Sequence, residues 1–254
     1  MTLEQFRLDG KTALITGGNR GIGLAIAQIF VQAGASCMLT SRSETPGLKA
    51  LLEQEPDRVA WIGADVNDED APDRIVSATL KRFGRLDILV NNAGVADNGN
   101  FHEFTDAQLD FVMSTNLIAP FRIARAAIAP MLKQGSGAVV NIGSISGYVA
   151  NKPQLQVAYN SSKAAIHQMT RTMAFEYADK GIRVNALAPG YVVSDMTAGG
   201  IADAEWNHVW TANTPMGRFA EPVEMANCAL FLASDAASYV TGAILVADGG
   251  YTTH

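Results

Sequence analysis

Residues 16–23 read TGGNRGIG and join a short apolar run, residues 11–16, to a segment of helical periodicity, residues 21–33. Gly17 suits a tight turn, Gly21 lets a ligand approach the backbone, and Gly23 allows close packing of helix on strand. The amides and partial positive charge of a helix N-terminus favour an anion such as a pyrophosphate. A plain glycine-rich turn would look similar, so this loop alone leaves both interpretations open.

The alternation of strand and helix continues along the whole chain. Short apolar runs bounded by turn residues predict strands at 11–16, 35–40, 58–63, 86–91, 137–142, 182–187 and 243–248. Periodic segments predict helices at 21–33, 69–83, 106–133, 157–180 and 222–234. Asp106 is expected as an N-cap, and Gly84 and Gly181 as C-terminal caps. Such alternation predicts an α/β fold, a doubly wound, mainly parallel seven-stranded sheet with helices on both faces.

One segment stands apart from this alternation. We expect a single domain over residues 1–254, since no linker or repeat interrupts the chain. The least regular segment, near 190–216, is rich in Gly, Thr and Asn yet carries Trp206 and Trp210. A long irregular connection in a compact domain is usually functional, so we expect a substrate lid there.

Composition excludes several classes of function. The net charge of −6 has no compensating basic block, which argues against a nucleic-acid partner. No apolar stretch approaches transmembrane length and no signal peptide opens the chain, so we expect a cytoplasmic protein without membrane contact. Cys37 and Cys228 are expected as buried thiols, not a disulfide. The four histidines (His102, His167, His208, His254) lack metal-ligand spacing; no metal is predicted, although one at the extreme C-terminus stays open.

The end of the second predicted strand bears on the choice of nucleotide. A carboxylate about 20 residues past the glycines would bind the 2′-hydroxyl of NAD. Ser41 and Arg42 stand there instead, and a hydroxyl and a guanidinium can bond to a 2′-phosphate. Arg20 could approach the same phosphate from the loop. These residues favour NADP(H), with Glu44, two residues further on, as a counter-argument.

Tyr159 and Lys163 lie four residues apart in a predicted helix, and therefore on one face of it. A nearby ammonium stabilises a phenolate and lowers the tyrosine pKa toward the working pH. A tyrosine so tuned is suited to general acid–base catalysis at an alcohol or a carbonyl.

With these motifs, nearly the whole chain resembles the short-chain dehydrogenase/reductase family. The matching segments, in family order, are TGGNRGIG (16–23), DV (65–66), NNAG (91–94), Asn116, NIGS (141–144), YNSSK (159–163) and PGYVVS (189–194). The resemblance implies a Rossmann-like fold and hydride transfer from a nicotinamide cofactor. It departs at Gly143, where many members carry the first of two serines.

The resemblance also implies a role for each matching position. Ser144 would hydrogen-bond the substrate oxygen, Tyr159 would exchange the proton, Lys163 would lower the tyrosine pKa and hold the ribose, and Asn116 would anchor a water relay. Ser146 is the fallback for Ser144. The expected cofactor contacts are Gly17, Asn19, Arg20, Gly21, Ile22, Gly23, Ser41, Arg42, Asp65, Val66, Asn91, Ala93, Gly94, Tyr159, Lys163, Pro189, Gly190, Val192 and Ser194.

The C-terminal half looks most like the polyol and sugar dehydrogenases of the family. Between Ser144 and Tyr159, the side chains of Ser146, Asn151, Gln154 and Gln156 suit a substrate with several hydroxyls. The prediction is an NADP(H)-dependent interconversion of a ketose, or other polar ketone, and its polyol. A 3-oxoacyl-thioester reductase, a carbonyl reductase of non-sugar ketones and a non-catalytic nucleotide sensor remain alternatives.

We also expect a homotetramer, as is usual in this family. Charged residues make up only 17% of the chain, which is consistent with buried subunit contacts. The expected contact surfaces are helix 157–180, through Ala164, Ala165 and Ala174, and helix 222–234.

Overall fold

A computed structural model describes residues 3–253, in which seven strands form one sheet of order β3-β2-β1-β4-β5-β6-β7. The strands are β1 (Thr12–Thr16), β2 (Ser36–Ser41), β3 (Val59–Gly63), β4 (Ile88–Asn91), β5 (Gly137–Ile142), β6 (Ile182–Pro189) and β7 (Ile244–Ala247). Every pairing is parallel. The α/β sheet predicted from the sequence is therefore confirmed. Its order reverses between β1 and β4, where ligands bind in doubly wound sheets.

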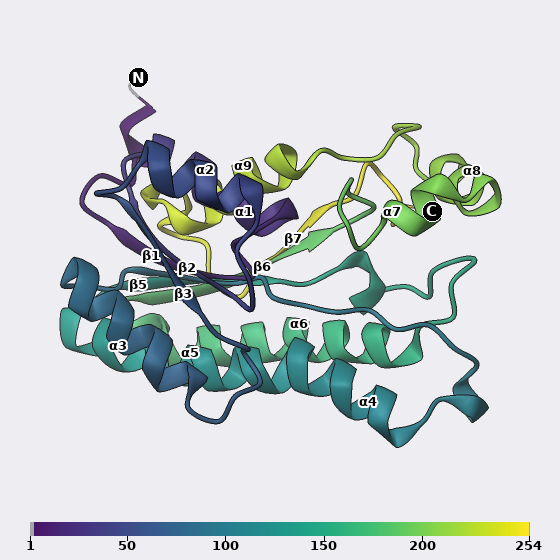
Figure 1. Ribbon diagram of the computed structural model, residues 1–254, viewed down its shortest axis with the longest axis horizontal. Helices are drawn as coiled ribbons and strands as arrows, with labels where there is room; N and C mark the ends of the chain where they lie inside the picture. The colour runs from purple at the N-terminus through teal and green to yellow at the C-terminus, as the bar shows by residue number, and fades with distance from the viewer. Residues whose placement is uncertain (1–2, 254) are drawn as a thin grey trace.

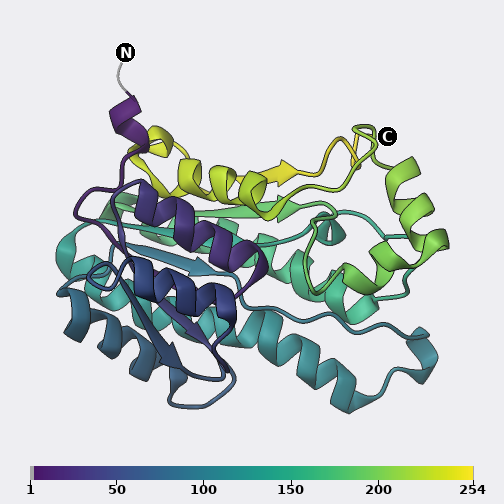
Figure 2. The ribbon, with the colours of Figure 1, turned by 45° about the horizontal axis from the view of Figure 1, so that its top comes forward.

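Helices cover both faces of the sheet (Figure 1). On one face, α1 (Gly21–Gln32) lies between α9 (Pro222–Ala233) and α2 (Pro46–Gln54), side by side in Figure 2. The other face carries α3 (Ala71–Phe83), α4 (Asp106–Met113), α5 (Ala119–Gln134) and α6 (Val157–Tyr177). All five residues of β1 are buried, and they alternate between two cores: Ala13 and Ile15 face α1 and α9, whereas Leu14 faces α3 and α5. Burial on both faces explains the continuous apolar runs of the sequence.

The predicted helix 106–133 is not continuous. A π-helical turn, η3 (Ser114–Ile118), separates α4 from α5 and contains the buried Asn116. The N-cap of α4 is Thr105 and not Asp106, because the Thr105 hydroxyl accepts from the Gln108 amide at 3.3 Å and completes a capping box. Gly84 and Gly181 do end helices as predicted, with φ of 78° and 74°.

Helix α2 was not predicted from the sequence. Thr45 caps it by accepting from the Leu48 amide, and Pro46 occupies its first position. Only Leu48 and Leu51 are buried in its nine residues, so the apolar periodicity is too short to reveal a helix. Its start matters for the site, because Thr45 lies on the cavity wall described below.

The segment near 190–216 is more regular than expected. It contains α7 (Ala198–Ala202) and α8 (Ala204–Ala212), which lie beyond the carboxyl ends of the strands in Figure 1. Trp210 is 4% exposed and packs so closely on Gly200 that a Cβ there would lie 2.1 Å from the indole. The expectation of an irregular connection is wrong because this indole gives the two short helices a core of their own.

Other expectations can be checked against the described residues. Ala174 is 3% exposed and belongs to the core beneath the sheet, so it is not available to another subunit; Ala164 is exposed. Both cysteines are free thiols; Cys37 is buried, and its pKa is raised by burial, while Cys228 is partly buried. Among residues 3–253, no helix is long and apolar enough to cross a membrane, and no cluster of three His, Cys, Asp or Glu forms a metal site. His254 lies outside these residues.

Candidate active site

A cavity of about 900 Å³ opens at the carboxyl ends of the strands, next to the loop between β1 and α1. It runs from this loop across the ends of β2 and β3 to Tyr159, and on to the aromatic side chains of α8. The predicted residues that line it are Gly17, Asn19, Arg20, Gly21, Ile22, Ser41, Arg42, Asp65, Val66, Ala93, Gly94, Ser144, Ser146, Asn151, Gln154, Gln156, Tyr159, Lys163, Pro189, Gly190, Val192 and Ser194. Positions spread over nearly 180 residues of sequence thus meet at one cavity.

The glycine loop is held in shape by close backbone packing. Gly17 has φ of 64°, and a Cβ on Gly23 would lie 2.3 Å from the Gly17 carbonyl oxygen. Asn92 fastens the turn by donating from Nδ2 to the carbonyl oxygens of Thr16 and Gly17, at 2.9 and 3.1 Å. Gly23 lies behind the cavity wall and acts on it through this packing.

The first turn of α1 fits a phosphate. Its N-cap is Arg20, whose backbone is extended and whose side chain makes no cap hydrogen bond. The amides of this turn therefore receive no cap from the Arg20 side chain, and Gly21, at the start of the helix, lines the cavity. A nucleotide phosphate is the chemistry that such amides accept.

Two of the three residues expected around a 2′-phosphate bond to other groups of the chain. Arg20 Nη1 bonds Asp195 Oδ2 at 2.7 Å, and both side chains are more than 60% exposed. The Ser41 hydroxyl donates to the Ser43 carbonyl and accepts from Trp61 Nε1, each at 2.9 Å. Arg42 lines the cavity and takes part in no ion pair among residues 3–253.

Besides Gly23, two predicted site residues stand behind the wall. Asn91 is 4% exposed and donates to Asn141 Oδ1 at 2.9 Å, so its side chain bridges β4 and β5; the adjacent Asn92 lines the cavity instead. Asn116 accepts from the Val95 amide at 2.9 Å and donates to the Val95 carbonyl and the Ser162 hydroxyl at 2.8 and 3.1 Å. Asn116 thereby fixes the segment beside Gly94, close to Lys163.

Tyr159, Lys163 and Ser144 come together at the inner end of the cavity. Lys163 Nζ lies 5.5 Å from the centre of the Tyr159 ring and donates to the Ile142 carbonyl oxygen at 2.8 Å. Burial lowers the pKa of Lys163 to about 8. Burial also raises the pKa of Tyr159, and a hydrogen bond with Ser144 opposes that rise. The pKa of the phenol is therefore raised, opposite to the direction expected from Lys163, because burial outweighs the neighbouring groups.

The serine turn, residues 143–147, connects β5 to this site. Ser144 Oγ accepts from the Ser146 amide at 3.1 Å, and Ser144 is the serine whose hydroxyl opposes the rise in the pKa of Tyr159. Ser146 Oγ instead donates to Asn151 Oδ1 at 2.6 Å and accepts from Gln156 Nε2 at 3.2 Å. Ser144 and Ser146 therefore face different parts of the cavity.

The outer end of the cavity combines carboxamides with aromatic rings. Gln154 Nε2 donates to the Tyr191 hydroxyl at 2.9 Å, and Gln154 Oε1 accepts from Trp210 Nε1 at 3.0 Å. The Tyr191 and Trp210 rings stack with centroids 4.2 Å apart, and Trp206 meets Trp210 edge-on at 5.6 Å. We call this group, with Asn151 and Gln156, the carboxamide–aromatic wall.

Sequence reasoning missed several lining residues, among them Asn92, Thr45, Thr115 and Tyr191. Asn92 and Tyr191 stand within NNAG and PGYVVS, so these two motifs contain a sequence signal for both residues. Thr45 and Thr115 carry no local signal, because an unpredicted helix start and a π-helical turn bring them to the cavity.

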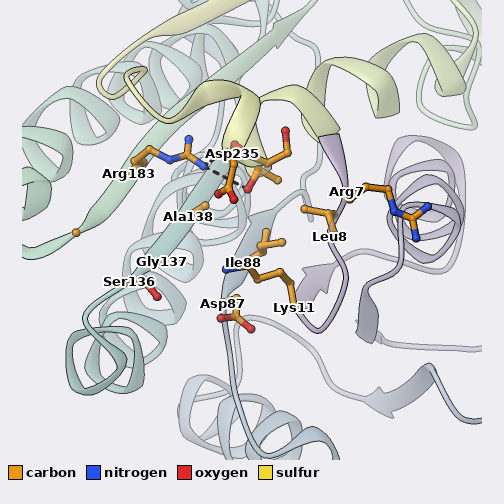
Figure 3. A pocket seen from close by; sticks show the side chains of 13 residues that line it. Arg7, Leu8, Lys11, Asp87, Ile88, Ser136, Gly137, Ala138, Arg183 and Asp235 are labelled. Carbon is orange, nitrogen blue, oxygen red and sulfur yellow. Dashed lines mark hydrogen bonds between the residues drawn. The ribbon is translucent and has the colours of Figure 1, made fainter. Parts of the chain in front are cut away.

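A smaller cavity of about 100 Å³ lies at the amino ends of the strands, opposite to the ends that line the larger cavity (Figure 3). Arg183 crosses it to donate to the Leu232 and Ser234 carbonyls at the end of α9, at 2.8 and 3.0 Å. The buried Asp87 accepts from Arg85 Nε and the Thr12 amide at 2.6 and 2.9 Å. Arg183 and Asp87 thus bond to other groups of the chain. Arg183 links β6 to the end of α9, and Asp87 links to the start of β1.

Comparisons with known proteins show what the chain is similar to. A family profile described as Enoyl-(Acyl carrier protein) reductase matches residues 17–252. Galactitol 2-dehydrogenase (L-tagatose-forming) of Cereibacter sphaeroides is 46% identical, over 97% of each chain. The 3-oxoacyl-(acyl-carrier-protein) reductase FabG of Chlamydia muridarum is 37% identical, over 96% of this chain and 98% of its own. The crystal structure of a gluconate 5-dehydrogenase from Burkholderia cenocepacia J2315, in complex with NADP and tartrate, superposes with a TM-score of 0.93 at 33% identity, covering 99% of each chain.

Proposed function

The chain belongs to the short-chain dehydrogenase/reductase family of oxidoreductases, and from this premise we propose that it interconverts a ketose, or a related polar ketone, and its secondary alcohol with NADP(H). The carboxamide–aromatic wall carries this proposal. Its own residues are uncharged carboxamides and aromatic rings, so it offers amide donors and acceptors beside flat apolar surfaces. A polyol presents hydroxyls to the former and C–H faces to the latter. The galactitol dehydrogenase named above acts on a substrate of this class.

The proposed roles follow from the contacts at the inner end of the cavity. Tyr159 is the general acid in reduction and the general base in oxidation, and Ser144 donates to the substrate oxygen that Tyr159 protonates. Lys163, held on the Ile142 carbonyl, supplies the positive charge that favours the phenolate. Asn116 is proposed as the anchor of a water that relays protons to Lys163. A bound nicotinamide supplies the two-electron chemistry.

The cofactor proposal depends on the end of β2. Arg42 is available for a 2′-phosphate, and Glu44, the acidic residue nearest in sequence, is drawn toward Lys49 Nζ at 3.8 Å. The amides of the α1 first turn would hold the pyrophosphate, with Asp65 and Val66 near the adenine and Val192 and Ser194 near the nicotinamide. We therefore propose NADP(H) in preference to NAD(H).

A 3-oxoacyl-thioester reductase is the second candidate, favoured by the identity to the Chlamydia muridarum enzyme. It would use the same serine, tyrosine and lysine, so the substrate end of the cavity must discriminate. An acyl thioester offers few hydroxyls to the amide groups of the carboxamide–aromatic wall, whereas a polyol offers several. That difference favours the polyol.

A substrate panel tests the proposed function. NADPH oxidation is measured with tagatose, sorbose, fructose and xylulose, and separately with an acetoacetyl thioester and an apolar ketone. Tyr159→Phe provides the background, since it keeps the cavity but has no proton to transfer. Turnover of ketoses well above the thioester is expected. Turnover of the thioester alone would establish the second candidate, and cofactor binding without any turnover would indicate a nucleotide sensor.

We also propose that the protein works as a cytoplasmic homotetramer. Phe175 on α6 is 89% exposed, and Val223 on α9 is 45% exposed. Two exposed apolar side chains on the helices named in the sequence analysis are consistent with a contact between subunits. Light scattering coupled to gel filtration gives the mass directly, and a monomer at micromolar concentration would reject this assembly.

A further inference from the structure

His167 is a buried titratable residue for which the proposed mechanism has no use. It lies on α6 one turn beyond Lys163, and it is 2% exposed. Neither ring nitrogen has a hydrogen-bond partner within residues 3–253. A polar ring buried without partners is costly, so its presence calls for a reason other than hydrogen bonding.

The imidazole fills the space under the serine turn. A Cβ on Gly143 would lie 2.5 Å from His167 Nε2, and a Cβ on Gly147 would lie 2.5 Å from Cε1. Neither glycine has a positive φ, so backbone conformation does not require glycine at either position. The ring of Tyr148 covers the imidazole with centroids 4.7 Å apart. Both ends of the turn thus rest on one ring.

Two backbone hydrogen bonds also hold the serine turn, one to the sheet and one within the turn. The Gly143 amide donates to the Leu187 carbonyl on β6 at 2.7 Å, and the Gly147 amide donates to the Ser144 carbonyl at 3.0 Å. Ser144 is therefore held between β6 and the imidazole. A shift of either support moves its hydroxyl relative to Tyr159.

We propose that His167 is a positioning residue, which sets the place of the Ser144 hydroxyl by supporting Gly143 and Gly147. Glycine at these two positions leaves the space that the imidazole occupies. The inference rests on the proposed roles of Ser144 and Tyr159. The ring is neutral at pH 7, because burial, Lys163 and Arg171 lower its pKa to about 4. It therefore adds no positive charge beside Lys163.

A double-mutant cycle between His167 and Gly143 tests the proposal. His167→Ala removes the support, and Gly143→Ala drives a methyl group into the ring; each is expected to lower kcat about tenfold or more while the KM for NADPH stays unchanged. In the double variant the methyl group occupies the vacated space, so kcat should exceed that of Gly143→Ala alone. Effects that simply multiply would overturn the proposal.

Two further variants separate positioning from other roles. His167→Leu keeps the volume and removes the nitrogens, so it should retain kcat within about threefold; a loss as large as in His167→Ala would mean that the nitrogens act chemically and would overturn the proposal. Ile75→Ala makes a comparable cavity on α3. It should lower Tm without lowering kcat, and if His167→Ala behaves in the same way its role is only structural.

The thermal arm of the cycle needs no substrate. Gly143→Ala should lower Tm, and His167→Ala added to it should recover part of the loss, whatever the enzyme reduces. Wild-type turnover on the substrate panel tests the proposed function separately, so the two ideas can fail independently.

Discussion

Replacing Lys163 by Met should stabilise the folded protein at neutral pH, although it removes a residue for which we propose a role in turnover. Lys163 is 5% exposed, and in the part of the chain that the structure describes its ammonium has one hydrogen-bond acceptor, the Ile142 carbonyl. Burial lowers its pKa from 10.5 to about 8. Met has a similar length and no charge to bury, so the variant isolates the cost of the ammonium.

The pKa difference sets the size of the effect. A downward pKa shift of this size means that charging Lys163 costs about 3 kcal/mol more in the folded chain than in the unfolded chain. The variant also loses the hydrogen bond to Ile142, worth about 2 kcal/mol for a charged donor. The expected net gain at pH 7 is therefore about 1 kcal/mol.

The dependence on pH is the sharper part of this prediction. Below about pH 8 the lysine is charged in both the folded and the unfolded chain, so the wild type bears the full cost. Between about pH 8 and pH 10.5 the unfolded chain binds more protons, and the stability of the wild type rises with pH. From pH 7 to pH 10 the wild type should gain about 2.5 kcal/mol relative to Lys163→Met.

Urea denaturation of both proteins at several pH values between 7 and 10 measures this difference, and other titrating groups cancel in the comparison. Lys133→Met is the matched control, because Lys133 is exposed on α5 and solvated in both states. A stability difference between wild type and Lys163→Met that stays constant over this range would refute the reasoning, since the ammonium would then not be buried at a cost.

Three further predictions concern the cavity. Tyr159→Phe should lower kcat about 1,000-fold with the Kd of NADPH unchanged, as measured by turnover and nucleotide fluorescence; retained turnover would show that another group transfers the proton. Ser41→Asp with Arg42→Ala should move the ratio of kcat/KM for NADPH over NADH by about 100-fold toward NADH, and an unchanged ratio would remove Arg42 from the 2′-phosphate site. Gly23→Ala should weaken NADPH binding at least tenfold and lower Tm, because its Cβ would lie 2.3 Å from the Gly17 carbonyl; calorimetric titration showing wild-type affinity would mean that the loop tolerates the shift.

Much of the fold could be predicted because the residues that specify it are neighbours in sequence. The runs that form β1 to β7 are apolar on both faces, and glycines stop helices at positions 84 and 181. Helix α2 escaped prediction because only two of its residues face the core. The break at Asn116 escaped because a π-helical turn has no local signal of its own, and the groups that Asn116 bonds, Val95 and Ser162, lie 21 and 46 residues away in sequence.

For the candidate site too, a residue could be predicted where its geometry depends on neighbours in sequence. Tyr159, Lys163 and the glycine loop come from short motifs whose geometry is local. The hydrogen-bond partners of Arg20 and Ser41 are not local: Asp195 lies 175 residues from Arg20, and Trp61 lies 20 residues from Ser41. A sequence pattern identifies the side chain at such a position, but it does not identify the group for which a ligand must compete.

That competition limits what Arg20 can contribute to cofactor choice. Its ion pair with Asp195 is exposed on both sides, and exposed pairs are worth only about 0–1 kcal/mol. A dianionic phosphate would displace the Asp195 carboxylate from Arg20 at little cost. The free energy that Arg20 then gains is only the difference between its interaction with the phosphate and its interaction with the carboxylate. Arg42 has no ion-pair partner to give up among residues 3–253, so it gains the full interaction. Selectivity for a 2′-phosphate should therefore depend on Arg42 far more than on the arginine inside the glycine loop.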